Sequence, residues 1–528
     1  MTTETKTRGQ LMAADISALL RARNPLIWIV TREEARVERL VFEAGAAAGY
    51  NPRTWDAAQG ITDMAGNQPS DLRDGLDVGA ALTIIGSRAK GKERGLWVMR
   101  DLPEWLAGTI GMVTKRQLRN LTRTLPGAPR EGAQAIVIIS PSGDVPAELA
   151  GHATLIDWPM PDRAEIAAIL DAAIESLPDD LRNSAAPNGQ RDAAIDAAVG
   201  LSGEEAQACY ARSLVQLRKI DPALVNSEKK RVVSRERVLE WFEPLKGGLD
   251  SVGGLEFLKT WLGVRKSAYS PAARAYGLPA PKGVLLVGIP GTGKSLTAKA
   301  VSTAWGVPLL KVDLGALKSK FVGDSEANLR KVFKIIEALG RCVVWFDEIE
   351  KSLQGATSGS ADGGVSSDAL GAVLSWMQER QGEAFVIATA NDAASLPPEL
   401  LRKGRFDEVW FIDLPTTTER TAVLSAALRT HGRGDVKVDA AEIAKATDGF
   451  TGSEIAALVP DALFSAFNDG AREINTDDLI AAARSVVPLS KTAPEKIAAL
   501  REWGATRARP ASAPEAKAKA SKMVALDL

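Results

Sequence analysis

The sequence feature that most constrains this chain is the segment GIPGTGKS at residues 288–295. It follows the apolar run GVLLV at 283–287 and precedes LTAKAV at 296–301, so the pattern predicts a loop between a buried parallel strand and a helix. Glycines allow such a loop to curl until successive backbone N–H groups point at one phosphate near a helix N-terminus. The segment therefore predicts a phosphate-binding loop.

Two carboxylates are expected to complete this site. Lys294 can reach the β- and γ-phosphates of a nucleotide, and Ser295 can offer its hydroxyl to Mg²⁺. The segment VVWFDE at 343–348 predicts a second buried strand, which delivers Asp347 beside the Mg²⁺. Glu348 then lies where a base can orient and deprotonate the attacking water. The combination predicts ATP hydrolysis with Mg²⁺.

Three polar residues follow the next apolar run, FVIATA at 385–390. Asn391 ends that strand, where a neutral amide can bond both the γ-phosphate and the water; a strand-end turn asparagine is the alternative. Arg402 and Arg405 lie on a predicted turn, where a guanidinium can grip γ-phosphate oxygens bidentately. A solvated arginine pair is the alternative, and the sequence does not say which arginine is the main one.

The whole-chain properties narrow the class of protein. At 528 residues the chain is expected to hold more than one domain, and 45% hydrophobic with 25% charged residues is ordinary for a globular protein. A net charge of −1 does not call for nucleic acid or an anionic membrane as partner. The two cysteines, Cys209 and Cys342, indicate a reducing compartment. No run is long enough to span a bilayer and the start lacks an apolar signal core, so we expect a soluble, cytoplasmic protein.

Similar sequence segments occur in the same order in the first and second halves of the chain. GLWVMRD at 95–101 resembles VVWFDE at 343–348, and GLSGEE at 200–205 resembles GFTGSE at 449–454. The residues that would bind and hydrolyse a nucleotide are missing from the first half, however. The apolar run at 26–30 is followed by TREE without glycine or a lysine-serine pair, the Asp-Glu pair becomes Asp-Leu, and the arginine-bearing stretch is shortened. These changes predict a catalytically inactive copy; an unrelated α/β domain is the alternative.

Taken together, several segments resemble the AAA ATPases in the narrow sense, the clade of the ubiquitin-dependent segregases and FtsH proteases. The segments that carry the resemblance are VGGL at 252–255, the phosphate-binding loop, FDE at 346–348, ATAN at 388–391, GRFD at 404–407 and GFTGSE at 449–454. More narrowly, ATAND at 388–392, LPPELLRKGRFDE at 396–408 and VPLS at 487–490 resemble AAA proteins encoded in red-algal plastids and cyanobacteria. Residues 21–34 resemble the same group, so the likeness covers most of the chain.

The resemblance implies a fold and a domain plan. We expect an α/β protein whose large ATPase subdomain (246–416) has the parallel sheet of phosphate-loop nucleotidases and is followed by a helical lid (417–490). A degenerate copy of the same architecture is expected at 1–245, with its core at about 20–160 and its lid at about 161–245. The final part, 491–528, is expected to hold a helix and then an Ala/Lys/Pro-rich disordered tail from residue 505.

The resemblance also implies site residues and partners. The expected ATP-binding set is Gly288, Pro290, Gly291, Thr292, Gly293, Lys294, Ser295, Leu296, Asp250, Val252, Gly253, Gly452 and Ser453. A homo-hexamer is expected, in which Arg402 and Arg405 act on the phosphate of a neighbouring subunit. Lys320, Phe321 and Val322 are expected to line a central pore, where Phe321 grips a protein client; packing of Phe321 in the core is the alternative.

Some functions are excluded and others stay open. Only His152 and His431 exist and no His-Glu-x-x-His occurs, so a fused zinc protease is excluded. The Gly/Ser-rich run at 354–368 predicts a flexible loop. An ATP-driven protein remodeller is the leading hypothesis, and an ATP-controlled assembly switch or scaffold is the second. A nucleic-acid motor is third, because no basic tract with interleaved aromatics occurs.

Overall fold

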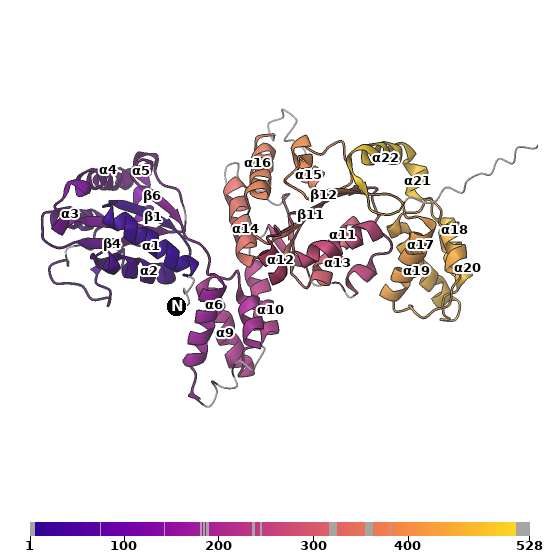
Figure 1. The fold of residues 1–528 in the computed structure, drawn as a ribbon, viewed down its shortest axis with the longest axis horizontal. Helices are drawn as coiled ribbons and strands as arrows, with labels where there is room; N and C mark the ends of the chain where they lie inside the picture. The colour runs from indigo at the N-terminus through magenta and orange to yellow at the C-terminus, as the bar shows by residue number, and fades with distance from the viewer. Residues whose placement is uncertain are drawn as a thin grey trace, which may run out of the picture. The chain divides into compact units, whose positions relative to one another are not determined.

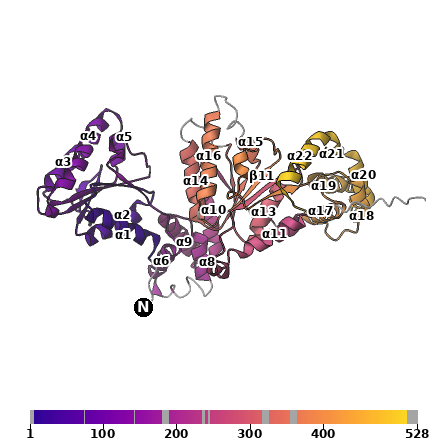
Figure 2. The same ribbon diagram turned by 45° about the horizontal axis from the view of Figure 1, so that its top comes forward.

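The computed structural model of the chain describes residues 6–513, except 74, 142, 180–181, 183–184, 186–189, 235–237, 243–244, 246, 316–324, 354–362 and 381. The chain divides into two compact units, Met1–Lys229 and Lys230–Leu528. Each unit holds a parallel or mostly parallel sheet with helices on both faces (Figures 1 and 2), which confirms the predicted α/β class. Among the described helices, none is long and apolar enough to cross a membrane.

The first unit is built on a sheet in the order β3-β2-β4-β5-β1-β6. Its strands are β1 (Leu26–Val30), β2 (Asn51–Asp56), β3 (Gly60–Thr62), β4 (Gly95–Met99), β5 (Gln134–Ser140) and β6 (Thr154–Asp157). All pairings are parallel except that of β2 with β3. Every residue of β4 and β5 is buried, as expected for strands that helices cover on both faces.

Helices cover both faces of this sheet. They are α1 (Arg8–Arg21), α2 (Glu34–Ala47), α3 (Val78–Arg88), η1 (Leu102–Leu106), α4 (Gly108–Thr124), η2 (Leu125–Gly127), η3 (Arg130–Gly132) and α5 (Ala147–Ala150). Side chains of α1 and α2, such as Ile16 and Val41, pack on one face of the sheet. Side chains of α3, α4 and α5, such as Leu82 and Leu118, pack on the other, so α1 and α2 lie opposite α3–α5 in Figure 1.

The second unit holds a larger sheet in the order β13-β12-β8-β11-β10-β9-β7. Its strands are β7 (Leu239–Phe242), β8 (Gly283–Gly288), β9 (Leu309–Val312), β10 (Val343–Phe346), β11 (Phe385–Ala390), β12 (Glu408–Ile412) and β13 (Arg509–Pro510). Only β7 runs antiparallel to its neighbour. Since β7 joins this sheet, the second unit includes residues on the amino-terminal side of the domain boundary expected at 245.

Two layers of helices enclose the second sheet. Its helices are η4 (Gly248–Ser251), α11 (Glu256–Ser267), α12 (Pro271–Tyr276), α13 (Lys294–Trp305), α14 (Ser325–Leu339), α15 (Ile349–Leu353), α16 (Gly363–Glu379), η5 (Pro398–Leu401), α21 (Leu489–Thr492) and α22 (Pro494–Arg507). Helices α14, α15, α16 and α22 pack on one face, while α11 and α13 pack on the other (Figure 1). Helix α16 begins at Gly363, so the last part of the loop predicted at 354–368 is helical; the residues before 363 lie outside the described part.

The two sheets share one topology. If the five common parallel strands of each sheet are numbered in chain order, both sheets read 5-1-4-3-2, with β1 and β8 in the second place. Each sheet is followed by a group of helices with matching caps. Ser202 and Glu205 form a capping box at the start of one lid helix, and Thr451 and Glu454 form one at the equivalent helix. The first half therefore has the architecture of the second, as the repeated segments predicted.

The two helical groups have the following bounds. The first contains α6 (Arg163–Glu175), α8 (Gln190–Ala198), α9 (Gly203–Leu217) and α10 (Pro222–Val233). The second contains α17 (Thr417–Thr430), α18 (Ala440–Ala446), α19 (Gly452–Asn468) and α20 (Thr476–Ser485), which pack around their own apolar core. This second group is the predicted helical lid.

The segment after α22 differs from the expected disordered tail. Strand β13 pairs in parallel with β12 and covers the edge of the sheet. Next to it, Ala511 is buried, and its carbonyl oxygen accepts the N–H groups of Phe257 and Leu258 at 3.1 and 3.2 Å. Helix α11 has no side-chain cap of its own, so this carbonyl satisfies its first turn. Disorder from residue 505 was therefore wrong for residues 505–513, because distant backbone groups supply their partners.

We expect a chain that ends at residue 508 to unfold its second unit at a lower temperature than the full chain. Loss of β13 and of the two bonds to Ala511 costs about 2 to 3 kcal/mol. Differential scanning calorimetry measures the effect. A chain that ends at residue 513 retains these contacts and serves as the control, so equal transition temperatures for the two truncations would contradict this role.

Candidate active site

The candidate site lies where three parallel strands of the second sheet end. Strand β11 lies between β8 and β10, with Ala390 opposite Val287 and Ala388 opposite Phe346. Because parallel strands present their carboxyl ends at the same edge, the residues that follow them meet there. The phosphate-binding loop follows β8, the acidic pair follows β10 and Asn391 follows β11.

The loop after β8 has the backbone conformation that its glycines predict. Gly291 and Gly293 have φ values of 78° and 90°, which other residues rarely adopt. A side chain at Gly291 would also collide with the hydroxyl of Ser453. The remaining members of the predicted set on this loop lie between the end of β8 and the first turn of α13. They are Gly288, Pro290, Thr292, Lys294, Ser295 and Leu296.

Lys294 is held inside the loop. Its side chain is buried, and its Nζ donates to the carbonyl oxygens of Gly288 and Ile289 at 2.8 and 2.7 Å. Burial lowers the pKa of Lys294 to about 8, although nearby carboxylates of Glu350 and Glu348 oppose this shift. A phosphate group placed on the loop would supply the counter-charge that this buried amine lacks.

Asp347 joins the three strand ends through hydrogen bonds. Its Oδ1 accepts from Ser295 Oγ at 3.0 Å and from Thr389 Oγ1 at 2.9 Å, while Lys311 Nζ lies 3.3 Å from Oδ2. A hydroxyl and a carboxylate this close are the oxygen ligands that suit Mg²⁺. The residues present therefore fit a magnesium ion, with Ser295 and Asp347 as the groups that would hold it.

Glu348 is held in an unusual backbone conformation next to Asp347. Its φ is 48°, a left-handed value that costs a non-glycine residue about 1 to 3 kcal/mol and that is found at functional sites. Its N–H donates to Thr389 Oγ1 at 3.0 Å, which fixes the backbone. Its carboxylate accepts from Asn391 Nδ2 at 2.7 Å and pairs with Lys351 at 2.7 Å. The geometry thus brings together the predicted base and the predicted amide.

The two arginines lie on the turn between η5 and β12. Arg402 is exposed, whereas Arg405 is partly buried and donates to the carbonyl oxygen of Glu399 in η5. Gly404 between them has a φ of 99°, so the turn uses a left-handed glycine. Neither arginine is buried within its own chain.

The lid contributes to the site through the N-terminus of α19. Gly452 and Ser453 form its first turn, and the N–H of Ser453 donates to the carbonyl oxygen of Gly291 at 2.8 Å. A helix N-terminus carries a partial positive charge, so it suits an anionic ligand. The predicted lid residues therefore contact the phosphate-binding loop directly.

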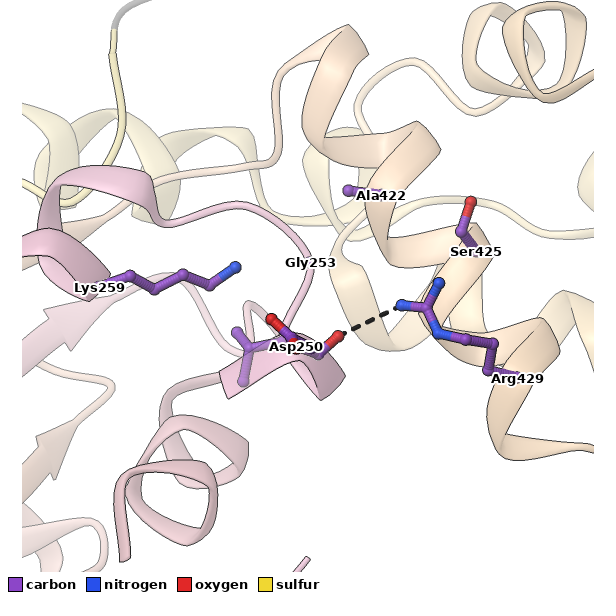
Figure 3. A pocket seen from close by; sticks show the side chains of 7 residues that line it. Asp250, Gly253, Lys259, Ala422, Ser425 and Arg429 are labelled. Carbon is purple, nitrogen blue, oxygen red and sulfur yellow. Dashed lines mark hydrogen bonds between the residues drawn. The ribbon is translucent and has the colours of Figure 1, made fainter. Parts of the chain in front are cut away.

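Asp250, Val252 and Gly253 lie beside a cavity of about 460 Å³ between the start of the second unit and lid helix α17 (Figure 3). Arg429 of α17 donates to the carbonyl oxygen of Asp250 at 3.3 Å. Gly253 touches the same helix so closely that any side chain there would meet the backbone of Val423. The other residues lining the cavity are Lys259, Ala422 and Ser425.

Several residues around the site were not singled out from the sequence. They are Thr389, Glu350, Lys311, Lys351 and Arg429. Thr389 is part of the predicted strand-end segment, and its position before Asn391 was the signal available. The expected pore residues Lys320, Phe321 and Val322 lie outside the described residues.

The equivalent place in the first unit is occupied by an acidic side chain. Glu33, which follows β1, is buried, and its carboxylate accepts the N–H of Gly203 at the N-terminus of α9. Arg36 pairs with Glu33 at 2.6 Å and with Glu165 at 3.0 Å, and it donates to Pro159 O at 2.7 Å. Here an anion of the protein itself contacts the lid-helix N-terminus, whereas the second unit has a phosphate-binding loop.

Comparison with known families agrees with this geometry. Residues 284–414 match the ATPase family associated with various cellular activities (AAA), and residues 437–481 match the AAA+ lid domain. Residues 12–158 and 164–236 match the N-terminal and second domains of SpoVK-like AAA ATPases. The fold and the site define a protein with an AAA ATPase domain and its lid.

Matches over nearly the full length of the chain identify its family more narrowly. It is 36% identical to the uncharacterized AAA domain-containing protein ycf46 of Guillardia theta, over 93% of this chain and 94% of that protein. It is 34% identical to the ycf46 protein of Pyropia yezoensis, over 94% and 99% of the two chains. The chain belongs to this family of AAA proteins. An ATP-dependent zinc metalloprotease FtsH of Acidothermus cellulolyticus is 36% identical over 39% of this chain and 31% of its own length.

We expect the wild-type chain to bind one ATP per chain and Lys294→Ala to bind none. The substitution removes the amine that the loop holds for the phosphates, and the first unit has Glu33 where its phosphate-binding loop would be. Isothermal titration calorimetry measures the stoichiometry. Lys299→Ala is the control, because Lys299 lies further along α13 over the ring of Phe242. Residual binding by Lys294→Ala would reveal a second site and contradict this expectation.

Proposed function

We propose that this protein is a Mg²⁺-dependent ATPase that assembles into a ring, most simply a homo-hexamer, and remodels a protein client. One observation supports the chemistry above all others. Ser295, Asp347 and Thr389 are hydrogen-bonded at the ends of three adjacent strands, and Glu348 and Asn391 are bonded to each other beside them. This arrangement combines a phosphate-binding loop, a metal-binding pair and a base in one place.

The residues of the chain have distinct tasks in this proposal. The loop N–H groups and Lys294 would bind the phosphates, and Ser295 and Asp347 would hold a magnesium ion, which would supply positive charge to the phosphate oxygens. Glu348 accepts a proton from the attacking water. Asn391 orients the Glu348 carboxylate through the 2.7 Å hydrogen bond and can also donate to the water or to the γ-phosphate. Asp250, Val252, Gly253, Gly452 and Ser453 complete the nucleotide site, between the large subdomain and the lid.

A ring is supported by the position of the arginines. Arg402 is exposed, and among the described contacts Arg405 donates only to a carbonyl oxygen of η5. An arginine that reaches the γ-phosphate of the neighbouring subunit stabilises charge in the transition state and makes hydrolysis depend on assembly. The inactive first unit then serves as a platform for clients or adaptors.

Of the parts of this proposal, the protein client depends most on the similarity to known proteins. The peroxisomal ATPase pex6 of Schizosaccharomyces pombe is 31% identical over 57% of this chain and 31% of its own length, and the FtsH relative is an ATP-dependent protease. In this proposal Lys320, Phe321 and Val322, the pore residues implied by the family resemblance, would grip an extended polypeptide. Cys209 and Cys342 are both buried, and a chain with only two cysteines suits work in a reducing compartment.

We expect Glu348→Gln to bind ATP like the wild type while its turnover falls at least about 100-fold, because the base is lost and the phosphate contacts remain. Nucleotide binding is measured by calorimetry and turnover by phosphate release. Wild-type turnover in this variant would contradict the role of Glu348.

The same variant tests the client. With ATP bound, Glu348→Gln protein should retain a client that mass spectrometry identifies, and Phe321→Ala in the same chain should lose it. Retention that does not depend on Phe321 would favour the assembly-switch hypothesis.

We expect Arg402→Ala and Arg405→Ala to keep ATP binding, while the substitution of the main arginine lowers turnover by about 10³-fold. Lys403→Ala, on the same turn, is the control and should retain its activity.

Mixing provides the decisive measurement. Lys294→Ala chains cannot bind ATP but carry intact arginines, so mixing them with the inactive arginine variant should restore turnover if the arginine acts between subunits. A mixture as inactive as its parts would contradict a site shared between chains.

A further inference from the structure

A second glutamate lies behind the catalytic pair. Glu350 is in the first turn of α15, directly after β10, and its side chain is 1% exposed. Its Oε1 accepts the backbone N–H of Asn391 at 3.0 Å. Its other oxygen, Oε2, is buried and has no hydrogen-bond partner among the described residues. The tasks proposed above for the site do not use this carboxylate.

The hydrogen bond between Asn391 and Glu350 lies just beyond the point where β11 stops pairing with its neighbouring strands. Strand β11 ends at Ala390, which is the last residue paired with β8. Asn391 is therefore the first residue outside the ladder, and its N–H needs an acceptor other than a neighbouring strand. The carboxylate of Glu350 provides that acceptor, and it comes from the helix that follows the adjacent strand, β10.

A short chain of contacts connects this bond to the reacting groups. Glu350 holds the backbone of Asn391, whose side-chain amide reaches Glu348 at 2.7 Å. Burial raises the pKa of Glu350, and the negative charge of Glu348 raises it further, while the bond from Asn391 opposes this. A buried carboxylate is costly, and an apolar side chain would fill the same space without that cost. The free-energy cost of burying this carboxylate is explained if the Asn391 N–H needs it as a hydrogen-bond acceptor.

We infer that Glu350 is a positioning residue for ATP hydrolysis: by accepting the N–H of Asn391 it sets the direction of the Asn391 amide and so orients the Glu348 carboxylate. This inference rests on the proposed ATPase function. It assigns Glu350 no contact with nucleotide, water or metal. The inferred effect passes through the hydrogen bond to Asn391. The charge of Glu350 also acts on Lys294, so the substitutions below separate the hydrogen-bond acceptor from the charge.

Two substitutions at Glu350 separate the acceptor from the charge. Glu350→Ala removes the acceptor and should lower kcat roughly 10- to 100-fold, as a misplaced catalytic group does, while KM for ATP and the ATP Kd stay within about threefold. Glu350→Gln keeps an oxygen at the same distance and should retain kcat within about threefold of the wild type. Thermal unfolding of each variant shows that the comparison is made on folded protein.

A matched control and a double substitution complete the test. Glu337→Ala removes a glutamate of the same subdomain that bonds Trp376 Nε1, and it should leave kcat unchanged. In an Asn391→Ala background, Glu350→Ala should have little further effect on kcat, because the amide that Glu350 positions is already gone. A structural role in the core would lower kcat equally in both backgrounds.

The outcomes are distinct. Loss of kcat in Glu350→Ala, rescue in Glu350→Gln and non-additivity with Asn391→Ala support the inference. Additive effects, equal loss in both Glu350 variants, or loss of ATP binding in step with kcat would overturn it, even with an active wild type. A wild-type protein without ATP turnover would instead overturn the proposed function, and the inference with it.

If Glu350→Ala does not fold, Glu350→Gln alone and combined with Asn391→Ala still decides the matter. Loss of kcat in folded Glu350→Gln would contradict an acceptor role, and wild-type kcat would support it.

Discussion

The candidate site depends on one carboxylate that joins three strands. Asp347 accepts from Ser295 of the loop after β8 and from Thr389 of β11, and it belongs to the residues that follow β10. Parallel pairing brings these strand ends together, and the hydrogen bonds to Asp347 connect their side chains. Thr389 extends the same network to the backbone of Glu348. A single hydrogen-bond network therefore connects Ser295 and Asp347, the proposed metal-binding pair, with Glu348, the proposed base.

The two units show how one topology can carry different chemistry. Both sheets have the same strand order. In the first unit the N-terminus of α9 contacts the segment after β1, and in the second unit the N-terminus of α19 contacts the segment after β8. In the second unit this segment is the glycine loop, and in the first it carries Glu33 with Arg36. In the first unit the Glu33 carboxylate accepts a backbone N–H at this helix N-terminus, a position that favours an anion. The fold alone does not define a nucleotide site; the residues after one strand do.

The lid and the segment after β13 contact the large subdomain in one region. Ser453 bonds Gly291 of the loop, and Glu419 at the start of α17 accepts the N–H of Leu255 at 2.9 Å. Ser512 also bonds Glu419, so the residues after β13 reach the same place. The phosphate-binding loop, the lid and the segment after β13 are therefore connected by hydrogen bonds.

The sequence by itself determined the α/β class, the repeated architecture and the residues around the phosphate-binding loop, because these follow from local patterns: an apolar strand, a glycine turn and a polar residue at each strand end. The tertiary structure alone decided the contacts made across long sequence distances. The roles of Glu350, Thr389 and Arg429, the strand at 509–510 and the acidic contact of Glu33 with α9 all depend on partners far along the chain. No local pattern encodes such partners, since they are chosen when packing brings distant backbone groups together and leaves each buried donor in need of an acceptor.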